Sequence, residues 1–430
     1  MPVDLSRLYQ AFDPAPLTPG QQTSLYVDLA KVRGEHEVGG VANSLAQHMR
    51  LASGPTCQLL TGHRGSGKST ELYRLEAKLG EGQRKTFVVF CDIDQALNRN
   101  DLDFPDLLLA IVRQLAEQLK AKAGIMLKPG YFQDRFGELM EFLGADVAVD
   151  RMELTYGLAK IVGTLKNSPK SRQKSRDMLE PKVDSLLYAA NDLIAEAKKA
   201  LVAKGFADLA IIVDNTDHMS RPSGEGADAL PGKPLFINRY PEVSGFDCHI
   251  VYAVPLELAF SVCGSELKRL YGRTTPVVGI AKVQTRNGQP YAAGVDCFRE
   301  VIAKRVAFAG TTGSEVFASD AVRDDLIART GGQPLELCSL IRECMLGGLP
   351  IQAKRLTEVV VQEQRSYAKW LKRGHWAEIE RIRAGEQPIP DDTNGAALRD
   401  LIEGRAILYH QNGDAGFSIS PLVGLAPAGL

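Results

Sequence analysis

Short apolar runs alternate with amphipathic helical patterns between Cys57 and about Lys282. Five runs have the length and composition of buried strands: CQLLT (57–61), TFVVFCDI (86–93), LAIIVD (209–214), CHIVYAV (248–254) and TPVVGIA (275–281). Strands that alternate with helices are typical of a parallel sheet, because each parallel strand needs a crossover connection. The pattern therefore predicts an α/β domain over residues 56–285.

The stretch between the second and third runs, residues 103–205, is too long for one crossover helix. It repeats apolar residues at helical spacing in several pieces, such as Val183, Leu186, Leu187, Ala190, Leu193 and Ile194. We therefore expect a large helical insertion in the sheet domain.

The flanking segments have other patterns. Residues 1–55 form a mixed lead-in, which we interpret as a strap onto the sheet domain. Residues 286–365 are helical throughout and predict a helical lid. Residues 366–430 end with a helix (396–403), a strand (406–411), an Asn-Gly turn and a second strand (416–420), which predict a winged helix.

Composition narrows the class of protein only slightly. The 430 residues carry 51 Lys plus Arg and 52 Asp plus Glu, so a net charge of -1 gives no global attraction to polyanions. The start of the chain lacks the apolar core of a signal peptide, and no run reaches the length of a membrane span. The seven cysteines are scattered and odd in number, which favours reduced thiols. We expect a soluble cytoplasmic protein without a membrane partner.

The strongest motif directly follows the first apolar run. Residues 62–69, G-H-R-G-S-G-K-S, match G-x-x-x-x-G-K-[ST] in full and precede a helical pattern. Glycines allow the tight backbone whose N–H groups wrap phosphates, and the next helix offers its positive end. Lys68 would contact the β- and γ-phosphates, and the Ser69 hydroxyl would bind Mg²⁺. The predicted site comprises Gly62, Arg64, Gly65, Ser66, Gly67, Lys68, Ser69 and Thr70, with the side chains of His63 and Arg64 on the loop surface.

A carboxylate after a neighbouring buried strand would complete the magnesium site. Asp214 follows the apolar run of LAIIVD and has this position, which is that of a Walker B element. The next residue is usually acidic in ATPases of this broad class, but here it is Asn215, which predicts slow hydrolysis. Asp217 and Glu257 are alternative candidates for the residue that orients water, with a turn and a strand end as their structural alternatives.

The order of these elements resembles the AAA+ and STAND branches of P-loop NTPases over roughly residues 25–425. The run T-G-G-Q-P-L-E-L (330–337) is similar to the G-x-P element of the NACHT and NB-ARC families, which implies that Pro334 contacts adenine. A helix-breaking turn is the alternative. Leu335 stands where several AAA+ members have a sensor arginine, a departure that favours STAND. By the same resemblance, Arg33 would lie near the base and Arg273 would be an arginine finger for a neighbour's nucleotide.

The resemblance implies an ATP-binding switch, or slow ATPase, in which nucleotide state controls the lid and the winged helix. ATP is favoured over GTP because the lid element resembles adenine-binding families and no N-K-x-D guanine motif is present. Self-association, a separate effector or sensor protein and a role in bacterial defence or signalling are implied by analogy.

Three alternatives remain open: a DNA-associated AAA+ ATPase such as a loader or transposition regulator, a small-molecule or nucleotide kinase, and a binding-only scaffold. The basic run 165–176 could contact DNA phosphates, but it lacks aromatic residues and we expect a solvated loop. The predicted hairpin tip, Asn412-Gly413-Asp414, also lacks cations, which favours a switch role for the winged helix. Histidines and cysteines show no zinc-ligand spacing.

Overall fold

The computed structural model describes residues 3–35, 39–98, 102–127, 162–163, 166–219, 230–285, 288–388, 395–413 and 415–425. The chain divides into two compact units. Unit 1 comprises Met1–Ser44, Gly62–Tyr73 and Val277–Leu430, and unit 2 comprises Leu45–Thr61 and Arg74–Pro276. Most of the Pro/Gly-rich stretch 221–234, which the sequence predicts to be a loop, and the tip residue Asp414 lie outside the described residues.

The central sheet has the strand order β2-β3-β4-β1-β5. Its strands are β1 (Cys57–Gly62), β2 (Thr86–Asp92), β3 (Asp208–Asp214), β4 (His249–Ala253) and the two-residue β5 (Val277–Val278). Strands β2, β3, β4 and β1 pair in parallel, with Asp92 of β2 directly opposite Asp214 of β3. The predicted five-stranded sheet is confirmed, although β5 is shorter than its apolar run.

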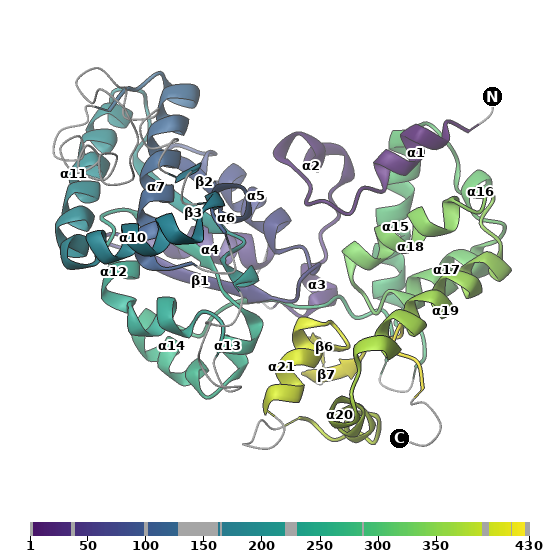
Figure 1. Ribbon diagram of the computed structural model, residues 1–430. Coiled ribbons are helices and arrows are strands. Elements are labelled where there is room, and N and C mark those ends of the chain that lie inside the picture. The colour runs from purple at the N-terminus through teal and green to yellow at the C-terminus, as the bar shows by residue number, and fades with distance from the viewer. Residues whose placement is uncertain are drawn as a thin grey trace. The chain divides into compact units, whose positions relative to one another are not determined.

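The helical insertion between β2 and β3 is also confirmed (Figure 1). Its described part contains α7 (Phe104–Gln118), a π-helical turn η1 (Leu119–Ala123), α10 (Pro169–Leu179), a 3₁₀ turn η3 (Glu180–Lys182) and α11 (Val183–Val202). Helix α7 packs on β2 and helix α11 on β3, so that leucine, isoleucine and valine side chains form one core with the sheet. Burial of this apolar surface is the main stabilising term of unit 2.

The basic run 165–176 is not the solvated loop that we expect from its charge. Most of it lies in α10, where Arg172 is buried and Arg176 makes an ion pair with the buried carboxylate of Asp106 on α7. The positive charge at this position therefore holds two helices of the insertion together.

Short elements complete the described part of unit 2. They are α6 (Ile93–Ala96) after β2, the 3₁₀ turn η4 (Thr216–His218) after β3, and η5 (Pro234–Asn238), α12 (Tyr240–Ser244), α13 (Leu256–Phe260) and α14 (Cys263–Tyr271) around β4. Helix α5 (Lys68–Leu79) follows the Gly-rich loop, and the boundary between the units crosses this helix as well as α4 (Gly40–Leu51).

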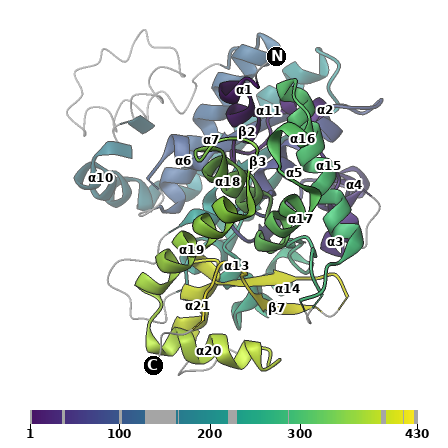
Figure 2. The same ribbon diagram turned by 90° about the vertical axis from the view of Figure 1, so that its right-hand side faces the viewer.

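Unit 1 contains the helices of the predicted lid: α15 (Ala292–Ala309), α16 (Gly313–Val316), α17 (Asp320–Arg329), α18 (Pro334–Met345) and α19 (Ala353–Trp370). Helices α15, α17, α18 and α19 pack on one another in sequence (Figure 2). The lead-in helices α1 (Leu5–Ala11), α2 (Pro19–Leu25) and α3 (Ala30–Arg33) pack on α15. The lead-in is thus grouped with the lid, whereas the boundaries at residues 55, 285 and 365 remain predictions.

The C-terminal elements have the helix-and-hairpin arrangement of a winged helix. They are α20 (Arg373–Arg383), α21 (Gly395–Glu403) and the antiparallel strands β6 (Ile407–His410) and β7 (Gly416–Ile419). Helix α20 packs on both α21 and β7. Among the described residues, no helix combines the length and the apolarity that a membrane span requires. All seven cysteines are free thiols.

Candidate functional site

The Gly-rich loop joins β1 to α5, and its conformation depends on glycine. Gly65 and Gly67 have φ angles of +83° and +101°, which side chains rarely adopt. A Cβ at Gly65 would lie 2.8 Å from the Cβ of Leu335, and one at Gly67 would lie 2.9 Å from Nη2 of Arg33. The loop therefore needs glycine both for its backbone angles and for close contact with its neighbours in unit 1.

Lys68 is the first residue of α5, and its ammonium folds back onto the loop. Its Nζ donates to the carbonyl oxygens of Gly62 at 2.7 Å and of His63 at 2.9 Å. The side chain is nearly buried, with 6% of the residue exposed. Because the first turn of a helix presents unpaired N–H groups and a positive dipole end, the lysine and the helix start together form an anion-binding element.

The residues after Lys68 connect the helix to the lead-in segment. The Thr70 hydroxyl accepts a hydrogen bond from the Leu17 amide at 3.2 Å, and the Thr70 carbonyl accepts one from the Gln22 side chain at 3.1 Å. Ser69 is half-buried beside it. The lead-in therefore holds the first turn of α5 in place.

Arg33 binds the Gly-rich loop itself. Its guanidinium donates to the Ser66 carbonyl at 2.6 Å and to the Glu71 carboxylate at 3.0 Å, and only 3% of the residue is exposed. The Tyr26 hydroxyl also donates to Glu71, at 3.1 Å. The guanidinium of arginine is a rigid planar fork of donors. Because it binds a loop carbonyl and a helix carboxylate together, Arg33 fixes the position of the loop. Sequence reasoning missed Glu71, whose only signal is an acid in the first turn of α5.

The predicted adenine element also reaches the loop. Gly331 and Gly332 have φ angles of +60° and +86°, and Pro334 is the first residue of α18. The Leu335 amide, one residue later, donates to the Gly65 carbonyl at 3.4 Å. Pro334 thus lies next to the lid residue that contacts the Gly-rich loop, while its contact with a base remains a prediction.

His63 is buried, which corrects the expectation that it lies on the loop surface. Only 2% of the residue is exposed, and Nε2 accepts a hydrogen bond of 2.8 Å from the Tyr409 amide of β6. Burial, followed by the positive charge of Lys68, lowers the pKa of His63 to about 3. Arg64, by contrast, is exposed as expected.

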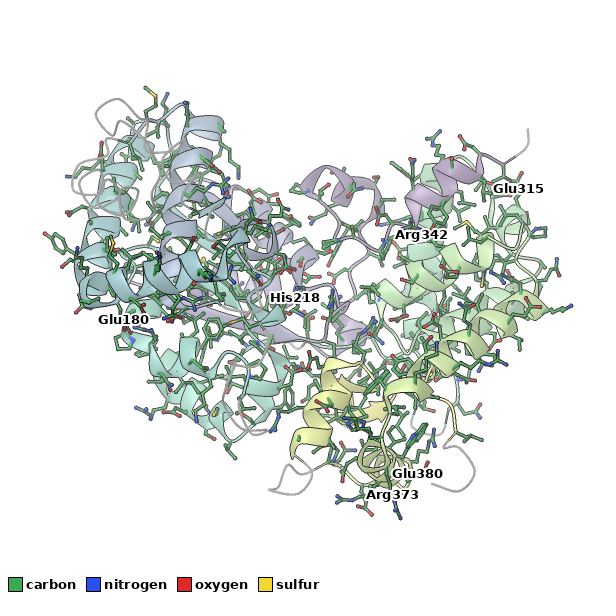
Figure 3. The ribbon with its side chains drawn as sticks, viewed as in Figure 1. Glu180, His218, Glu315, Arg342, Arg373 and Glu380 are labelled. Carbon is green, nitrogen blue, oxygen red and sulfur yellow. The ribbon has the colours of Figure 1, made fainter. Side chains whose placement is uncertain are left out.

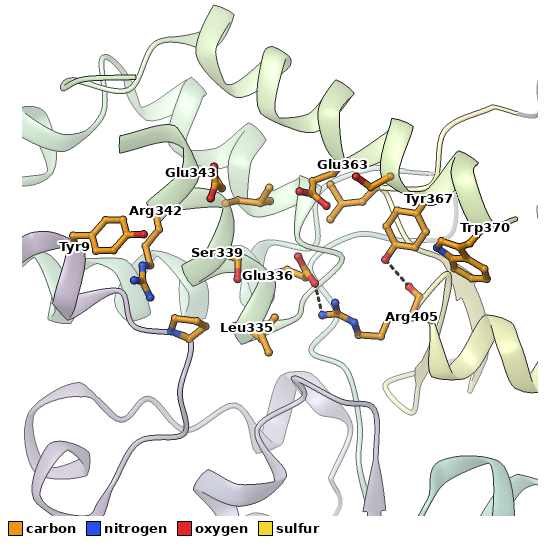
Figure 4. A pocket seen from close by; sticks show the side chains of 15 residues that line it. Tyr9, Leu335, Glu336, Ser339, Arg342, Glu343, Glu363, Tyr367, Trp370 and Arg405 are labelled. Carbon is orange, nitrogen blue, oxygen red and sulfur yellow. Dashed lines mark hydrogen bonds and ion pairs between the residues drawn. The ribbon is translucent and has the colours of Figure 1, made fainter. Parts of the chain in front are cut away.

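A cavity of about 520 Å³ lies in unit 1 beside the lid residue Leu335 (Figure 4). Arg405 crosses it to make an ion pair with Glu336, and the Tyr367 hydroxyl donates to the Arg405 carbonyl at 3.3 Å. The raised pKa of Glu363 has burial as its main cause, and the nearby carboxylates of Glu336 and Glu343 add to it. The cavity wall therefore joins the lid helices α18 and α19 to the winged helix through polar contacts.

The Walker B candidate is in unit 2. Asp214 ends β3 and is buried, and its Oδ1 accepts a hydrogen bond of 2.8 Å from the Asn215 amide. Asn215 has a φ of 66°, a conformation that asparagine tolerates better than most residues. Its side-chain amide donates to the Asp92 carboxylate of β2 at 2.8 Å. Asn215 therefore donates a hydrogen bond to Asp92 and adds no carboxylate base after Asp214.

One part of the Walker B prediction is wrong. Strand β4 lies between β1 and β3, so Asp214 does not end the strand next to the one that leads into the Gly-rich loop. The apolar runs could not show this order, because strand order depends on contacts between residues far apart in the chain.

Asp217 and Glu257, the alternative candidates for the residue that orients water, lie on different short elements of unit 2. Asp217 lies in η4 beside His218, the residue that Figure 3 labels. Nε2 of His218 is 3.8 Å from the Asp217 carboxylate, and Nδ1 of His218 is 2.9 Å from the Asp94 carboxylate. Glu257 is half-buried in the first turn of α13. Among the described residues, no group of three or more His, Cys, Asp or Glu side chains is arranged to hold a metal ion.

Arg273 is at the other end of β1 from the Gly-rich loop. Its guanidinium donates to the Gln58 side chain at 3.2 Å. Gln58 is four residues before Gly62, a separation of about 13 Å along a strand. Any contact of Arg273 with a nucleotide would therefore involve a neighbouring molecule, as the resemblance implies.

Three solved structures of known proteins are similar to this chain. No protein-family model matches the chain, and no curated protein matches it. The Walker-type ATPase PABY2304 of Pyrococcus abyssi is 13% identical with a TM-score of 0.45, over 96% of this chain and 98% of that one. The ORC2 protein of Aeropyrum pernix, solved as ADPNP-ADP complexes, is 13% identical with a TM-score of 0.43, over 97% and 94%. Cdc6p of Pyrobaculum aerophilum is 12% identical with a TM-score of 0.36, over 92% and 95%.

The structure itself defines the class. A buried parallel strand, a G-x-x-x-x-G-K-S loop in a glycine-dependent conformation and a helix that begins at the lysine together form the phosphate-binding element of the P-loop NTPase fold. In this chain the P-loop is followed by a helical insertion, a helical lid and a winged helix.

Proposed function

We propose that the protein is an ATP-binding P-loop ATPase of the AAA+ and STAND class, in which the nucleotide changes the contacts of the lid and the winged helix. One observation carries the proposal. The P-loop is bonded at once to Arg33 of the lead-in, to Leu335 of the lid and to Tyr409 of the winged helix. We therefore expect a phosphate that binds to this loop to act on all three segments.

The chemistry of the loop suits a nucleoside triphosphate. Phosphate oxygens would replace the carbonyls of Gly62 and His63 as acceptors of the Lys68 ammonium, because charged hydrogen bonds are the stronger ones. Mg²⁺ prefers oxygen ligands, and the Ser69 hydroxyl and the Asp214 carboxylate are the groups that we propose to bind it. Bound Mg²⁺ would neutralise charge on the phosphates. Pro334 and Arg33 are the residues that we propose near the base.

Slow hydrolysis is part of the proposal. The amide of Asn215 cannot accept a proton from water at neutral pH, and its bond to Asp92 holds it in place. Asp217 or Glu257 would then be the acid that orients water, with lower efficiency. If neither acid orients water, the protein would bind ATP without hydrolysing it.

We also propose that the protein self-associates and that Arg273 then contacts the nucleotide of a neighbouring molecule. A separate effector or sensor protein would be a further partner. ATP turnover and particle size, measured together on wild type and Lys68→Ala, test it. We expect slow turnover and a change of size with ATP in wild type, and neither in Lys68→Ala. Lys372→Ala, at an exposed position outside the P-loop, is the matched control. A wild type whose size is the same with and without bound ATP would contradict the switch.

A DNA-associated AAA+ ATPase is the second candidate. Its supporting observation is that Lys372 and Arg373 are exposed at the start of α20 in the winged helix, where Figure 3 labels Arg373. Such cations could contact duplex phosphates, and each contact that is lost should lower the salt dependence of binding. Duplex binding titrated at several salt concentrations, on wild type and Lys372→Ala/Arg373→Ala, tests it. Absence of binding at low salt would exclude this candidate.

A further inference from the structure

We propose that His63 is a positioning residue that couples the P-loop lysine to strand β6 of the winged helix. Its side chain is fixed by a backbone amide of β6, and its carbonyl is one of the two that hold the Lys68 ammonium. The inference rests on the proposed function, because it names the residue through which nucleotide binding would reach the winged helix.

The geometry concentrates both bonds on one residue. The Nε2 atom of His63 lies 2.8 Å from the Tyr409 amide nitrogen, and the carbonyl oxygen of His63 lies 2.9 Å from Nζ of Lys68. Both contacts lie within unit 1. Because the side chain and the peptide share one Cα atom, a shift of the peptide that moves this Cα when Lys68 leaves the carbonyl would also shift the imidazole.

At this position the Nε2 atom of the imidazole acts as an acceptor. Nε2 can accept the Tyr409 N–H only if it carries a lone pair, so the proton of the neutral ring is on Nδ1. Burial and the charges of Lys68, His410 and Arg405 all lower the pKa of His63, to about 3. The ring is therefore neutral at physiological pH, and the hydrogen bond is not switched by ordinary changes of pH.

Tyr409 passes a displacement to the rest of the hairpin. Its carbonyl accepts a hydrogen bond of 3.2 Å from the Ile280 amide, and its ring packs against Phe417 of β7 with centroids 5.3 Å apart. Tyr409 and Phe417 are also paired in the β6–β7 register. Loss or lengthening of the His63 bond would therefore act on both strands.

Hydrogen exchange of the Tyr409 amide measures the coupling directly. Full-length wild type, His63→Ala, His63→Gln and Lys68→Ala are compared with and without Mg·ATP. Without nucleotide, His63→Ala should exchange this amide roughly tenfold faster, because one buried hydrogen bond is lost. His63→Gln keeps a neutral acceptor and should restore slow exchange. With Mg·ATP, wild type should change its Tyr409 exchange and His63→Ala should not.

The matched control is His410→Phe, which changes the next residue of β6, a half-buried histidine whose ring contacts Ser418. It should keep the nucleotide response of wild type. An unchanged nucleotide response in His63→Ala would overturn the proposal, because transmission would then bypass the imidazole. If His63→Ala does not fold, His63→Phe fills the same volume without an acceptor and takes its place.

Binding of a fluorescent ATP analogue to the same samples separates the two claims. If wild type does not bind the analogue, the proposed function fails. The coupling is then judged from the Lys68→Ala protein, in which the His63 carbonyl loses its ammonium partner. Tyr409 exchange equal to that of wild type in Lys68→Ala would overturn the coupling, and altered exchange would support it.

Discussion

Two buried charged residues beside the P-loop are important for the stability of unit 1. Arg33 and Glu71 are both nearly excluded from solvent and lie 3.0 Å apart. Removing one partner of a buried ion pair leaves an uncompensated charge, which costs far more than the pair itself contributes. The stability of the loop therefore depends on the pair being complete.

We expect Arg33→Met to lower the free energy of unfolding by about 3–5 kcal/mol. The matched control is Arg113→Met, which breaks the half-exposed pair of Arg113 with Glu117 on α7 and should cost no more than about 1 kcal/mol. Chemical denaturation of the three proteins measures both changes. Equal effects of the two substitutions would mean that Arg33 does not support the loop.

Two histidines of unit 1, the buried His63 and the half-buried His410, make stability depend on pH. Burial is the main cause that lowers the pKa of His63 to about 3 and that of His410 to about 4, from 6.5 in the unfolded chain. Both contributions to stability are complete above pH 6.5. As pH falls below 6.5, the unfolded chain binds protons that the folded chain does not, so the free energy of unfolding decreases.

The loss should approach about 1.4 kcal/mol per pH unit for His63 between pH 6 and pH 4. For His410 it should approach this value only near pH 5, because the folded chain begins to protonate His410 as pH nears its lowered pKa of about 4. His63→Gln removes one titrating group, and its stability should fall less steeply over this interval by that amount. Denaturant titrations at several pH values measure the slopes. Parallel curves for wild type and His63→Gln would contradict a neutral, buried His63.

At the scale of elements, the turn before α18 controls how the lid meets the P-loop. Gly332 has a φ of +86°, and a Cβ there would lie 1.7 Å from the Ala281 carbonyl oxygen. Gly310, at the end of α15, has a φ of +78°, but a Cβ there would meet no heavy atom nearer than 3.9 Å. The two glycines share a backbone conformation and differ in the space around them.

Gly332→Ala should therefore cost at least about 4 kcal/mol, or prevent folding, because backbone must move. Gly310→Ala should cost only about 1–2 kcal/mol, the penalty for a left-handed residue. Thermal unfolding of both variants compares them. A similar shift of melting temperature in both would show that the lid does not pack on residue 281.

The sequence was sufficient for elements whose signal is local. Apolar runs located the strands to within about two residues, apart from the short β5, and the hairpin after Ala406 follows from its Asn-Gly turn. It was insufficient for contacts that join distant segments. His63 and Tyr409 are 346 residues apart, and no periodicity in either segment marks the bond between them. The position of β4 between β1 and β3 likewise depends on contacts between distant segments, which the apolar runs do not indicate.

In the whole molecule, the P-loop and strand β5 are grouped with the lead-in, the lid and the winged helix, whereas β2, β3, β4 and Cys57–Thr61 of β1 belong to the other unit. The proposed ATPase thus has its phosphate loop in the unit that would respond to it. Every part of this proposal requires that Lys68 and its loop bind ATP.

Titration calorimetry of ATP and GTP, with Mg²⁺, into wild type, Lys68→Ala and the surface control Lys372→Ala tests this claim most directly. We predict one ATP site per chain in wild type and Lys372→Ala, weaker binding of GTP, and a loss of ATP affinity of at least tenfold in Lys68→Ala. An affinity for ATP that is the same in Lys68→Ala as in wild type, or no heat of binding in wild type, would show that Lys68 and its loop do not bind ATP as proposed.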